Sequence, residues 1–285
     1  MTPMLWTSRT VRSLGRGDID EALELLAKHP VENVYLAARL QELDLSRGEG
    51  HALVYAPKGR IEAVCWMSAN IVPSAGSIEG AVAFGGRLRR HQQRFSSIFG
   101  PADVVTALWS QIQAFWRPPI EERLHQRLMA VGPEKALTVT PDKHVRVAHP
   151  DELDIIVPAA EAMFIEEIGY APYSDYAGSL SYRSANLALI RRGHTLAAIE
   201  DSQVIFKAEF GSVALGACQL QGVWVTPTRR GQGVAVPALA ACVEYARAHV
   251  APVVTLYVND YNVPAVAAYR RVGFEEVGEF ATVLL

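Results

Sequence analysis

A glycine-containing loop between a strand and a helix is the feature that most constrains this chain. We expect a strand over residues 217–225, the loop over 227–233, a helix over 234–249 and a second, β-branched strand over 253–258. This order predicts a strand–helix–strand unit. The first amides of such a helix have no partner within it, and glycine allows an anion to approach them closely. The sequence therefore predicts an anion site at the loop.

Two common nucleotide-binding loops fit poorly to the segment from Arg230 to Val236, called the glycine loop below. A dinucleotide-binding loop needs a small residue where this chain has the β-branched Val236, and an NTPase phosphate loop needs a Gly-Lys-Ser/Thr triplet that does not follow Gly233. The segment instead resembles the acyl-CoA signature R/Q-x-x-G-x-G/A of the GNAT superfamily of N-acetyltransferases, with Arg230, Gly233 and Ala235 at the lettered positions. An ordinary strand-to-helix turn would also place glycines here.

A second segment strengthens the resemblance. The downstream sequence matches the GNAT pattern N-x-x-A-x-x-x-Y-x-x-x-G-F at every lettered position, with Asn262, Ala265, Tyr269, Gly273 and Phe274. By its residue types it is a short helix with an asparagine N-cap and a closing glycine. The resemblance covers residues 141–285.

The resemblance implies both the cosubstrate, acetyl-CoA, and the residues that bind it. These are Val223, Trp224 and Val225 beside the pantetheine arm, Arg230, Gly231, Gln232, Gly233, Val234, Ala235 and Val236 around the pyrophosphate, and Asn262 at the pantetheine or its loop. Of the adjacent Arg229 and Arg230, we expect one to face phosphate and the other solvent. Tyr269 would protonate the departing thiolate, since a phenol is neutral at pH 7 and can donate a proton. The alternative is a tyrosine that only packs.

A general base is harder to assign, because the expected strand over 217–225 has no ionisable side chain. Glu209, which alternates with Lys207 on the preceding expected strand, is the nearest carboxylate, and Gln219 or Gln221 would be able to orient a water. A structural carboxylate is the alternative for Glu209. The acidic and aromatic segment 164–176 occupies the region that lines the acceptor pocket in the family, and its composition suits a cationic amine or, equally, a solvated helix end.

A faint internal repeat predicts two related domains. Residues 11–20 and 145–154 both show a short strand, a polar turn and the start of an amphipathic helix. Proline and glycine residues near position 140 suggest a boundary. We therefore expect an α/β (α+β) chain of two tandem GNAT-like domains, 1–140 and 141–285. Each would have a mixed, mostly antiparallel sheet flanked by helices, with a splayed strand pair in the second.

The first of these domains is expected to be degenerate. If Gly100-Pro101-Ala102-Asp103 stands at the place of the glycine loop, only one glycine remains there, the proline lacks an amide donor and the aspartate repels phosphate. An inactive first half and an active second half resemble tandem GNAT proteins. We expect no CoA site at this place in the first half.

Composition limits the other classes of function. The net charge of −3 argues against nucleic acid as a partner, and no apolar stretch suggests a membrane span or a secretory signal, so we expect a cytoplasmic protein. Cys65, Cys218 and Cys242 have apolar neighbours typical of reduced packing residues, and we assign no metal site. The predicted activity is direct acetyl transfer to the primary amine of a small molecule or protein. A CoA-binding sensor without turnover and an inactive scaffold are the alternatives.

Overall fold

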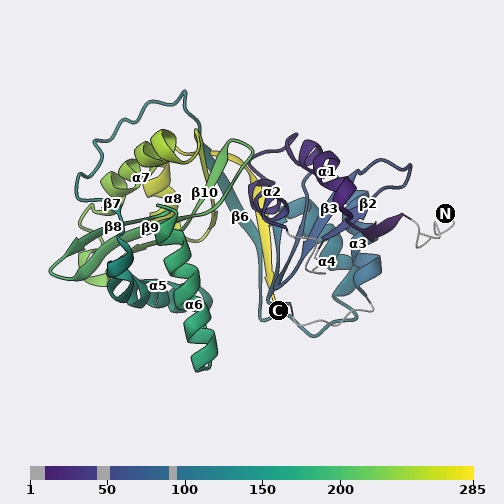
Figure 1. Ribbon diagram of the computed structural model, residues 1–285, viewed down its shortest axis with the longest axis horizontal. Helices are drawn as coiled ribbons and strands as arrows, with labels where there is room; N and C mark the ends of the chain where they lie inside the picture. The colour runs from purple at the N-terminus through teal and green to yellow at the C-terminus, as the bar shows by residue number, and fades with distance from the viewer. Residues whose placement is uncertain (1–9, 44–51, 90–94) are drawn as a thin grey trace. The chain divides into compact units, whose positions relative to one another are not determined.

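The computed structural model describes residues 10–43, 52–89 and 95–285 (Figure 1). The chain forms two compact units. Unit 1 comprises Met1–Met129, Tyr257–Tyr261 and Glu276–Leu285, and unit 2 comprises Ala130–Leu256 and Asn262–Glu275.

The described part of unit 1 is a sheet with the strand order β1-β2-β3-β4-β5-β12-β6 and four α-helices. Its elements are β1 (Val11–Ser13), α1 (Ile19–Leu26), α2 (Val34–Gln41), β2 (Ala52–Tyr55), β3 (Ala63–Met67), β4 (Asn70–Pro73), α3 (Ile78–Leu88), β5 (Ser97–Pro101), α4 (Ala102–Ile112), β6 (Glu121–Val131) and β12 (Glu275–Leu284). β4 and β5 are parallel, whereas β1, β2, β3 and β4 pair successively as antiparallel neighbours. The helix between the parallel strands is α3.

Unit 2 repeats this order of elements. They are β7 (Arg146–Val147), α5 (Leu153–Ile168), α6 (Tyr176–Arg191), β8 (Thr195–Glu200), β9 (Gln203–Ala214), β10 (Ala217–Val225), α7 (Ala235–His249), β11 (Val253–Asn259) and α8 (Val263–Val272). The strand order is β11-β10-β9-β8-β7, with β10 and β11 parallel and connected through α7. α5 and α6 cover one face of this sheet, and α7 and α8 lie on the other (Figure 1). The predicted mixed, mostly antiparallel architecture of two tandem units is confirmed.

The internal repeat is preserved in its hydrogen bonds. Near the start of unit 1, Arg12 donates from both terminal nitrogens to Asp18, at 2.5 and 2.8 Å; near the start of unit 2, Arg146 donates in the same way to Glu152, at 2.9 and 2.6 Å. In both copies the backbone amide three residues before the carboxylate donates to it at 2.7 Å. The arginine hydrogen bonds lower the pKa of Asp18 and hold that of Glu152 at about 2.

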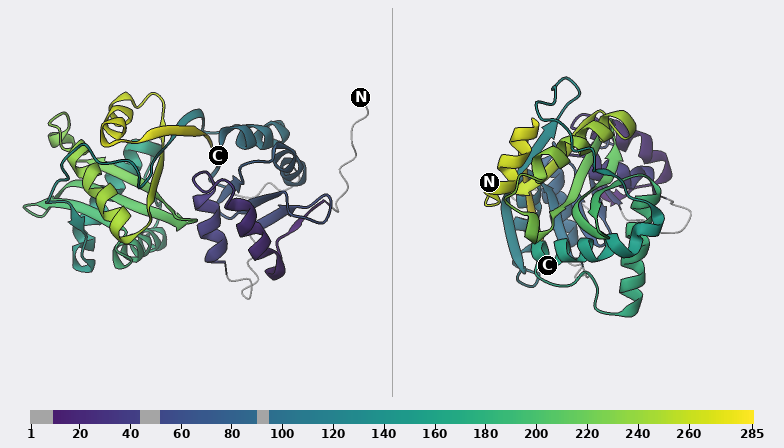
Figure 2. Two further views of the ribbon diagram at one scale, coloured as in Figure 1. Left: turned by 90° about the horizontal axis from the view of Figure 1, so that it is seen from above. Right: turned by 90° about the vertical axis from the view of Figure 1, so that its left-hand side faces the viewer.

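The C-terminal strand belongs to unit 1. β12, yellow in Figure 2, pairs antiparallel with β5 from Phe280↔Pro101 to Leu284↔Ser97. Its Ala281 and Val283 lie in the same hydrophobic cluster as side chains of β2, β3, α3 and α4. The core of unit 1 therefore includes residues from the C-terminal part of the sequence. A single domain boundary near residue 140 assigns these residues to the other unit.

The counterpart of the glycine loop in unit 1 is Ser74–Ser77, because this segment connects the first of the two parallel strands to the crossover helix α3. The expectation that Gly100–Asp103 occupies that place is wrong. Those residues lie where β5 meets α4, which corresponds in unit 2 to the turn before α8. A glycine suggested the match, but the order of parallel strands determines which turn is equivalent.

Protein groups accept hydrogen bonds from the first two amides of this unit 1 turn. The Ala75 amide donates to Asn33 Oδ1 at 2.9 Å, and the Ser74 amide donates to the Val64 carbonyl at 2.8 Å. The side chain of Ser77 caps α3 by accepting a hydrogen bond from the Gly80 amide at 3.1 Å. Asn33, which is 2% exposed, thus accepts the hydrogen bond of the Ala75 amide, which is then not available to an anion.

Candidate functional site

The glycine loop has the backbone that its sequence predicts. β10 ends at Val225, a short 3-10 turn covers Pro227–Arg229, and α7 begins at Ala235. Gly231 and Gly233 have φ angles of 74° and 80°, in the left-handed region that favours glycine. A Cβ atom at either position would meet nothing within 4 Å. The two glycines are thus required by the turn, and the space beside them is open.

The amides of this loop are available as donors. Within the described ranges, the amides of residues 231–236 have no hydrogen-bond partner; Pro237 has no N–H, and donation resumes with Ala238 to the Val234 carbonyl at 3.3 Å. These N–H groups stand at the positive end of the α7 dipole. Together they suit a phosphate or pyrophosphate group, which can accept several hydrogen bonds at once.

The two arginines of the loop have different partners. Arg230 donates from Nε to the Val225 carbonyl at 2.9 Å and from a terminal nitrogen to Glu166 Oε2 at 2.7 Å. Arg229 lies 3.3 Å from Glu200. Glu166 belongs to the segment 164–176, which was expected only to line the acceptor pocket. Its contact with the glycine loop spans 64 residues and had no local sequence signal.

β10 and β11 separate after a short paired stretch. Their register runs from Ala217↔Val253 to Gln219↔Thr255, although β10 continues to Val225. On its other edge β10 carries an irregularity between Gln221 and Trp224 opposite β9. The expected cosubstrate contacts Val223, Trp224 and Val225 all lie in the half-buried part of β10 that no longer pairs with β11, so the expected splay is confirmed.

The second motif forms α8 as its residue types predict. Asn262 is the N-cap and accepts a hydrogen bond from the Ala265 amide at 3.3 Å, while Gly273 ends the helix with φ of 112°. Tyr269 is 8% exposed, and its ring lies 5.7 Å from that of Phe274. Burial raises the pKa of Tyr269, with smaller contributions from Glu167 and Cys242. Its hydroxyl has no hydrogen-bond partner among the described residues and stays protonated at neutral pH.

Glu209 forms a buried ion pair with Lys207. The Lys207 ammonium lies 2.7 Å from Glu209 Oε1 without hydrogen-bond alignment and donates to the Gly222 carbonyl at 3.3 Å. Lys207 is fully buried and Glu209 is 6% exposed. A Cβ atom at Gly222 would lie 3.2 Å from both side chains. The pair thus lies directly against the irregularity of β10.

We expect Lys207→Met to destabilise the protein by about 3–5 kcal/mol, because it leaves the Glu209 carboxylate buried without its counter-charge. Urea unfolding of the variant checks this value. The double variant Lys207→Met/Glu209→Gln should recover much of the loss, since no buried charge remains. Equal stability of Lys207→Met and the unchanged protein would show that the pair contributes nothing to the fold.

Tyr182, which lies near Glu209, was not identified from the sequence, whereas its neighbour Tyr173 belongs to the segment 164–176 expected to line the acceptor pocket. Burial, followed by the charge of Glu209, raises the pKa of Tyr182 to about 12. The rings of Tyr182 and Tyr173 are 5.9 Å apart, and the Tyr173 hydroxyl donates to Glu161 at 2.5 Å. Tyr182 of α6 thus connects the β9 carboxylate to Tyr173 and Glu161. No motif connects these residues, because only the packing of α6 on β9 brings them together.

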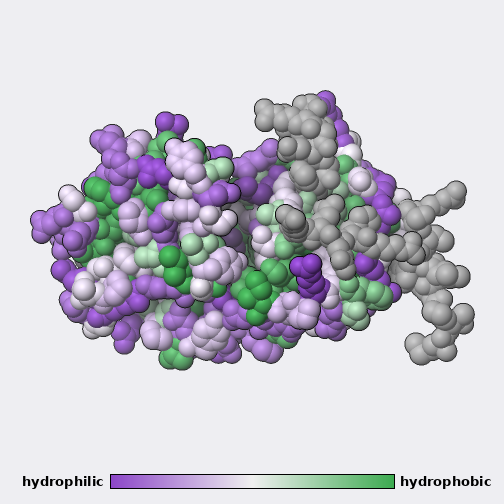
Figure 3. All heavy atoms as spheres, turned by 90° about the horizontal axis from the view of Figure 1, so that it is seen from below, coloured by the Kyte–Doolittle hydropathy of each residue, from purple (hydrophilic) through white to green (hydrophobic). Residues whose placement is uncertain are grey.

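α5, α6 and the turn between them carry exposed apolar side chains, among them Ile165, Tyr170, Tyr176 and Leu180. On the face shown in Figure 3, apolar surface is divided into separate patches among hydrophilic residues. We therefore assign no docking surface there.

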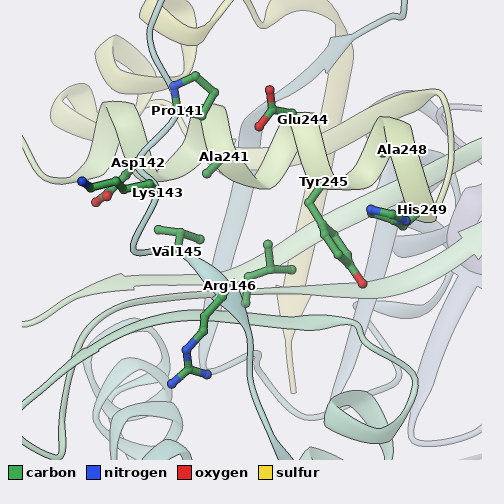
Figure 4. Close-up of a pocket in the computed structure, with 11 residues that line it drawn as sticks. Pro141, Asp142, Lys143, Val145, Arg146, Ala241, Glu244, Tyr245, Ala248 and His249 are labelled. Atoms are coloured by element: carbon green, nitrogen blue, oxygen red, sulfur yellow. The ribbon is translucent and has the colours of Figure 1, made fainter.

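A pocket in the described part of unit 2 lies away from the glycine loop. Its volume is about 380 Å³, and its walls come from the segment 141–146, Leu196 and one side of α7 (Figure 4). None of the predicted site residues lines it. The glycine loop is an exposed turn, and an anion there would be held by amides at the surface rather than inside a cavity.

Cysteine and metal chemistry find no support among the described residues. All three cysteines are free and buried, and burial raises their pKa values, to about 12 for Cys218. Cys242 is close enough to influence Tyr269, although no cysteine stands beside the motifs in sequence, and its buried thiol remains protonated. The described residues contain no cluster of three or more potential metal ligands. They also include no helix with the length and apolar character needed to span a membrane.

Comparison with solved structures supports the tandem fold. A GCN5-related N-acetyltransferase from Sphaerobacter thermophilus has 19% identity and a TM-score of 0.61, with 96% of this chain and 94% of that chain covered. A GNAT-family acetyltransferase from Colwellia psychrerythraea has 11% identity and a TM-score of 0.56, with 96% and 99% covered. A tandem GNAT protein from the clavulanic acid biosynthesis pathway has 13% identity and a TM-score of 0.57, with 95% and 97% covered.

Sequence profiles distinguish the two parts of the chain. Residues 50–156 match a domain of unknown function, DUF4081, and residues 162–274 match the acetyltransferase (GNAT) family. No curated protein matches the chain. The second match contains β10, the glycine loop, α7 and the complete second motif. Residues 162–274 therefore form a domain of the acetyltransferase (GNAT) family.

Proposed function

We propose that the protein is an acetyl-CoA-dependent N-acetyltransferase with a single cosubstrate site, in unit 2. The observation that carries this proposal is the row of amides at residues 231–236 that lack partners, at the turn between β10 and α7. These amides would hold the pyrophosphate, with Arg230 and Gln232 at the same turn. Val223, Trp224 and Val225 would offer backbone groups to the pantetheine arm, and Asn262 would fix the turn before α8.

The proposed reaction is a direct transfer. The acceptor nitrogen forms a bond to the thioester carbonyl carbon, and the carbon–sulfur bond then breaks. Tyr269 gives its proton to the departing sulfur, for which the phenol must be protonated at working pH; burial ensures this. The ammonium first gives one proton to Glu209, directly or through water, and attacks as the neutral amine; the second proton that the nitrogen loses returns to the tyrosinate left at Tyr269. No covalent enzyme intermediate is required.

The acceptor is proposed to be a primary amine that binds on the side of α5 and α6. Glu209 and Glu161 provide negative charge there, and Tyr173 and Tyr182 provide aromatic rings. This combination favours an ammonium group over an anionic acceptor. Small amines and protein amines both fit this chemistry. The buried, unpaired thiols suit a reducing compartment, so we propose that the protein acts in the cytoplasm.

A thiol-release assay with acetyl-CoA and a panel of amines tests the proposed function. Amine-dependent release of CoA, with a matching acetylated product by mass spectrometry, is the expected result. Binding of acetyl-CoA without turnover on any amine would favour a sensor, and the absence of binding would exclude both.

Tyr269→Phe should lower kcat about 10- to 100-fold, because the variant keeps the buried ring but cannot protonate the leaving thiolate. The KM for acetyl-CoA should change little, since Tyr269 lies outside the glycine loop. Steady-state kinetics on the best amine measure both constants. Phe274→Leu is the matched control for ring packing, because it alters the aromatic contact but leaves the hydroxyl. Full turnover in Tyr269→Phe would remove the tyrosine from the mechanism.

A further inference from the structure

Glu166 connects the glycine loop to the acceptor-side helix α5. It lies in the last turn of α5, and its two carboxylate oxygens accept hydrogen bonds from two different residues. Trp224 Nε1 donates to Oε1 at 3.3 Å, and Arg230 donates to Oε2 at 2.7 Å. The Arg230 Nε is fixed on the Val225 carbonyl at 2.9 Å. One carboxylate from α5 thus holds both the end of β10 and the first residue of the loop.

This contact places a negative charge beside a site built for a negative ligand. Arg230 directly precedes the row of amides that lack partners, and its guanidinium is the one side-chain cation within the glycine loop. While Glu166 neutralises this cation, the loop presents less positive potential to a pyrophosphate. A carboxylate and a phosphate are competing partners for one guanidinium, since both accept charge-assisted hydrogen bonds from it.

The ion pair is weak enough to be exchanged. The side chains of Arg230 and Glu166 are 46% and 43% exposed. Exposed pairs of this kind contribute only about 0–1 kcal/mol. By contrast, the Lys207–Glu209 pair is buried and fixed, with side chains 0% and 8% exposed. Exchange of Glu166 for a phosphate oxygen would therefore cost little.

We propose that Glu166 is a positioning residue that competes with the cosubstrate pyrophosphate for Arg230. It holds Arg230 and Trp224 on α5 when the loop is empty, and it yields Arg230 when a phosphate-bearing ligand binds. The last turn of α5 is then released from the loop, which couples the cosubstrate site to the acceptor side. Arg230, and not Arg229, is the phosphate partner. The inference rests on the proposed function, because it requires CoA at the glycine loop.

Calorimetric titration of the full chain with CoA tests this competition. Glu166→Gln retains an oxygen for Trp224 but removes the charge, and it should bind CoA about fivefold more tightly than the unchanged protein. Arg230→Gln should bind CoA more weakly, and Glu166→Gln should have no further effect in that background. A double-mutant cycle measures this non-additivity. Tighter CoA binding by Glu166→Gln distinguishes competition from a structural contact between α5 and the loop, because loss of a structural contact would weaken binding.

Two matched variants complete the test. Asp154→Asn removes another exposed carboxylate of α5 that pairs with an arginine, Arg183, far from the loop in sequence, and should change CoA affinity by less than about twofold. Glu200→Gln removes the carboxylate charge that pairs with Arg229, and it tests whether Arg229 rather than Arg230 is the phosphate partner. Unchanged or weaker binding by Glu166→Gln, or a larger gain with Glu200→Gln than with Glu166→Gln, would overturn the inference. A chain that binds no CoA in any form would instead overturn the proposed function.

Discussion

Val283→Asp is expected to unfold unit 1, although it changes a residue only two positions from the C-terminal end of the printed sequence. Val283 is fully buried in β12, pairs with Ile98 of β5 and lies in the main hydrophobic cluster of unit 1. A carboxylate at this position loses apolar burial and leaves an unpaired charge in the core. We expect a loss of about 4–5 kcal/mol or more, a large part of the stability of a typical domain.

Val277→Asp is the matched control, since it makes the same change on the same strand where the side chain is 48% exposed. Its effect should be within about 0.5 kcal/mol. Hydrogen exchange measured by mass spectrometry provides the decisive observation, through the protection of β5. If β5 stays protected in Val283→Asp, the C-terminal strand is not part of the core of unit 1.

Gly233→Val should abolish CoA binding while the protein remains folded. The new side chain would extend into the open space beside the amides that lack partners, where the phosphate is expected. Hydrogen bonds to charged groups contribute about 1.5–3 kcal/mol each, so losing two weakens binding about 100-fold or more. Calorimetric titration with CoA measures the loss.

Backbone strain needs its own control, because valine is unfavourable at φ of 80°. Gly216→Val introduces the same side chain at φ of 73°, also with nothing within 4 Å, in the hairpin between β9 and β10. Both variants should therefore lose similar amounts of thermal stability. CoA affinity should fall only in Gly233→Val. An equal fall in both would attribute the effect to strain instead of to the phosphate site.

Local sequence signals predicted unit 2 well. The glycine loop, the N-cap Asn262 and the closing Gly273 each depend on backbone preferences within a few residues, and the structure shows all three turns as expected. β10 ends at Val225, two residues before Pro227. Because proline has no amide N–H to donate to a neighbouring strand, the sequence predicts this boundary. The roles of Tyr269 and Glu209 remain predictions, since they depend on a reaction and not on a conformation.

Contacts between residues far apart in the chain could not be predicted from the sequence. The sequence around Lys207 does not indicate that its side chain is fully buried against Glu209, because a strand with alternating charges usually faces water. Glu166 likewise meets Arg230 only after α5 has packed on β10. The place of β12 beside β5 and the true counterpart of the glycine loop in unit 1 both follow from the order of strands in a sheet. That order is set by long-range pairing.

The central claim is that the chain holds one acyl-CoA site and that the glycine loop of unit 2 forms it. Calorimetric titration of the full chain with acetyl-CoA tests this claim most directly. We predict one molecule bound per chain, because the amides of residues 231–236 lack partners, whereas in the equivalent turn of unit 1 Asn33 and Val64 accept hydrogen bonds from the amides of Ala75 and Ser74. Two equivalent sites, or no binding at millimolar ligand, would contradict the account.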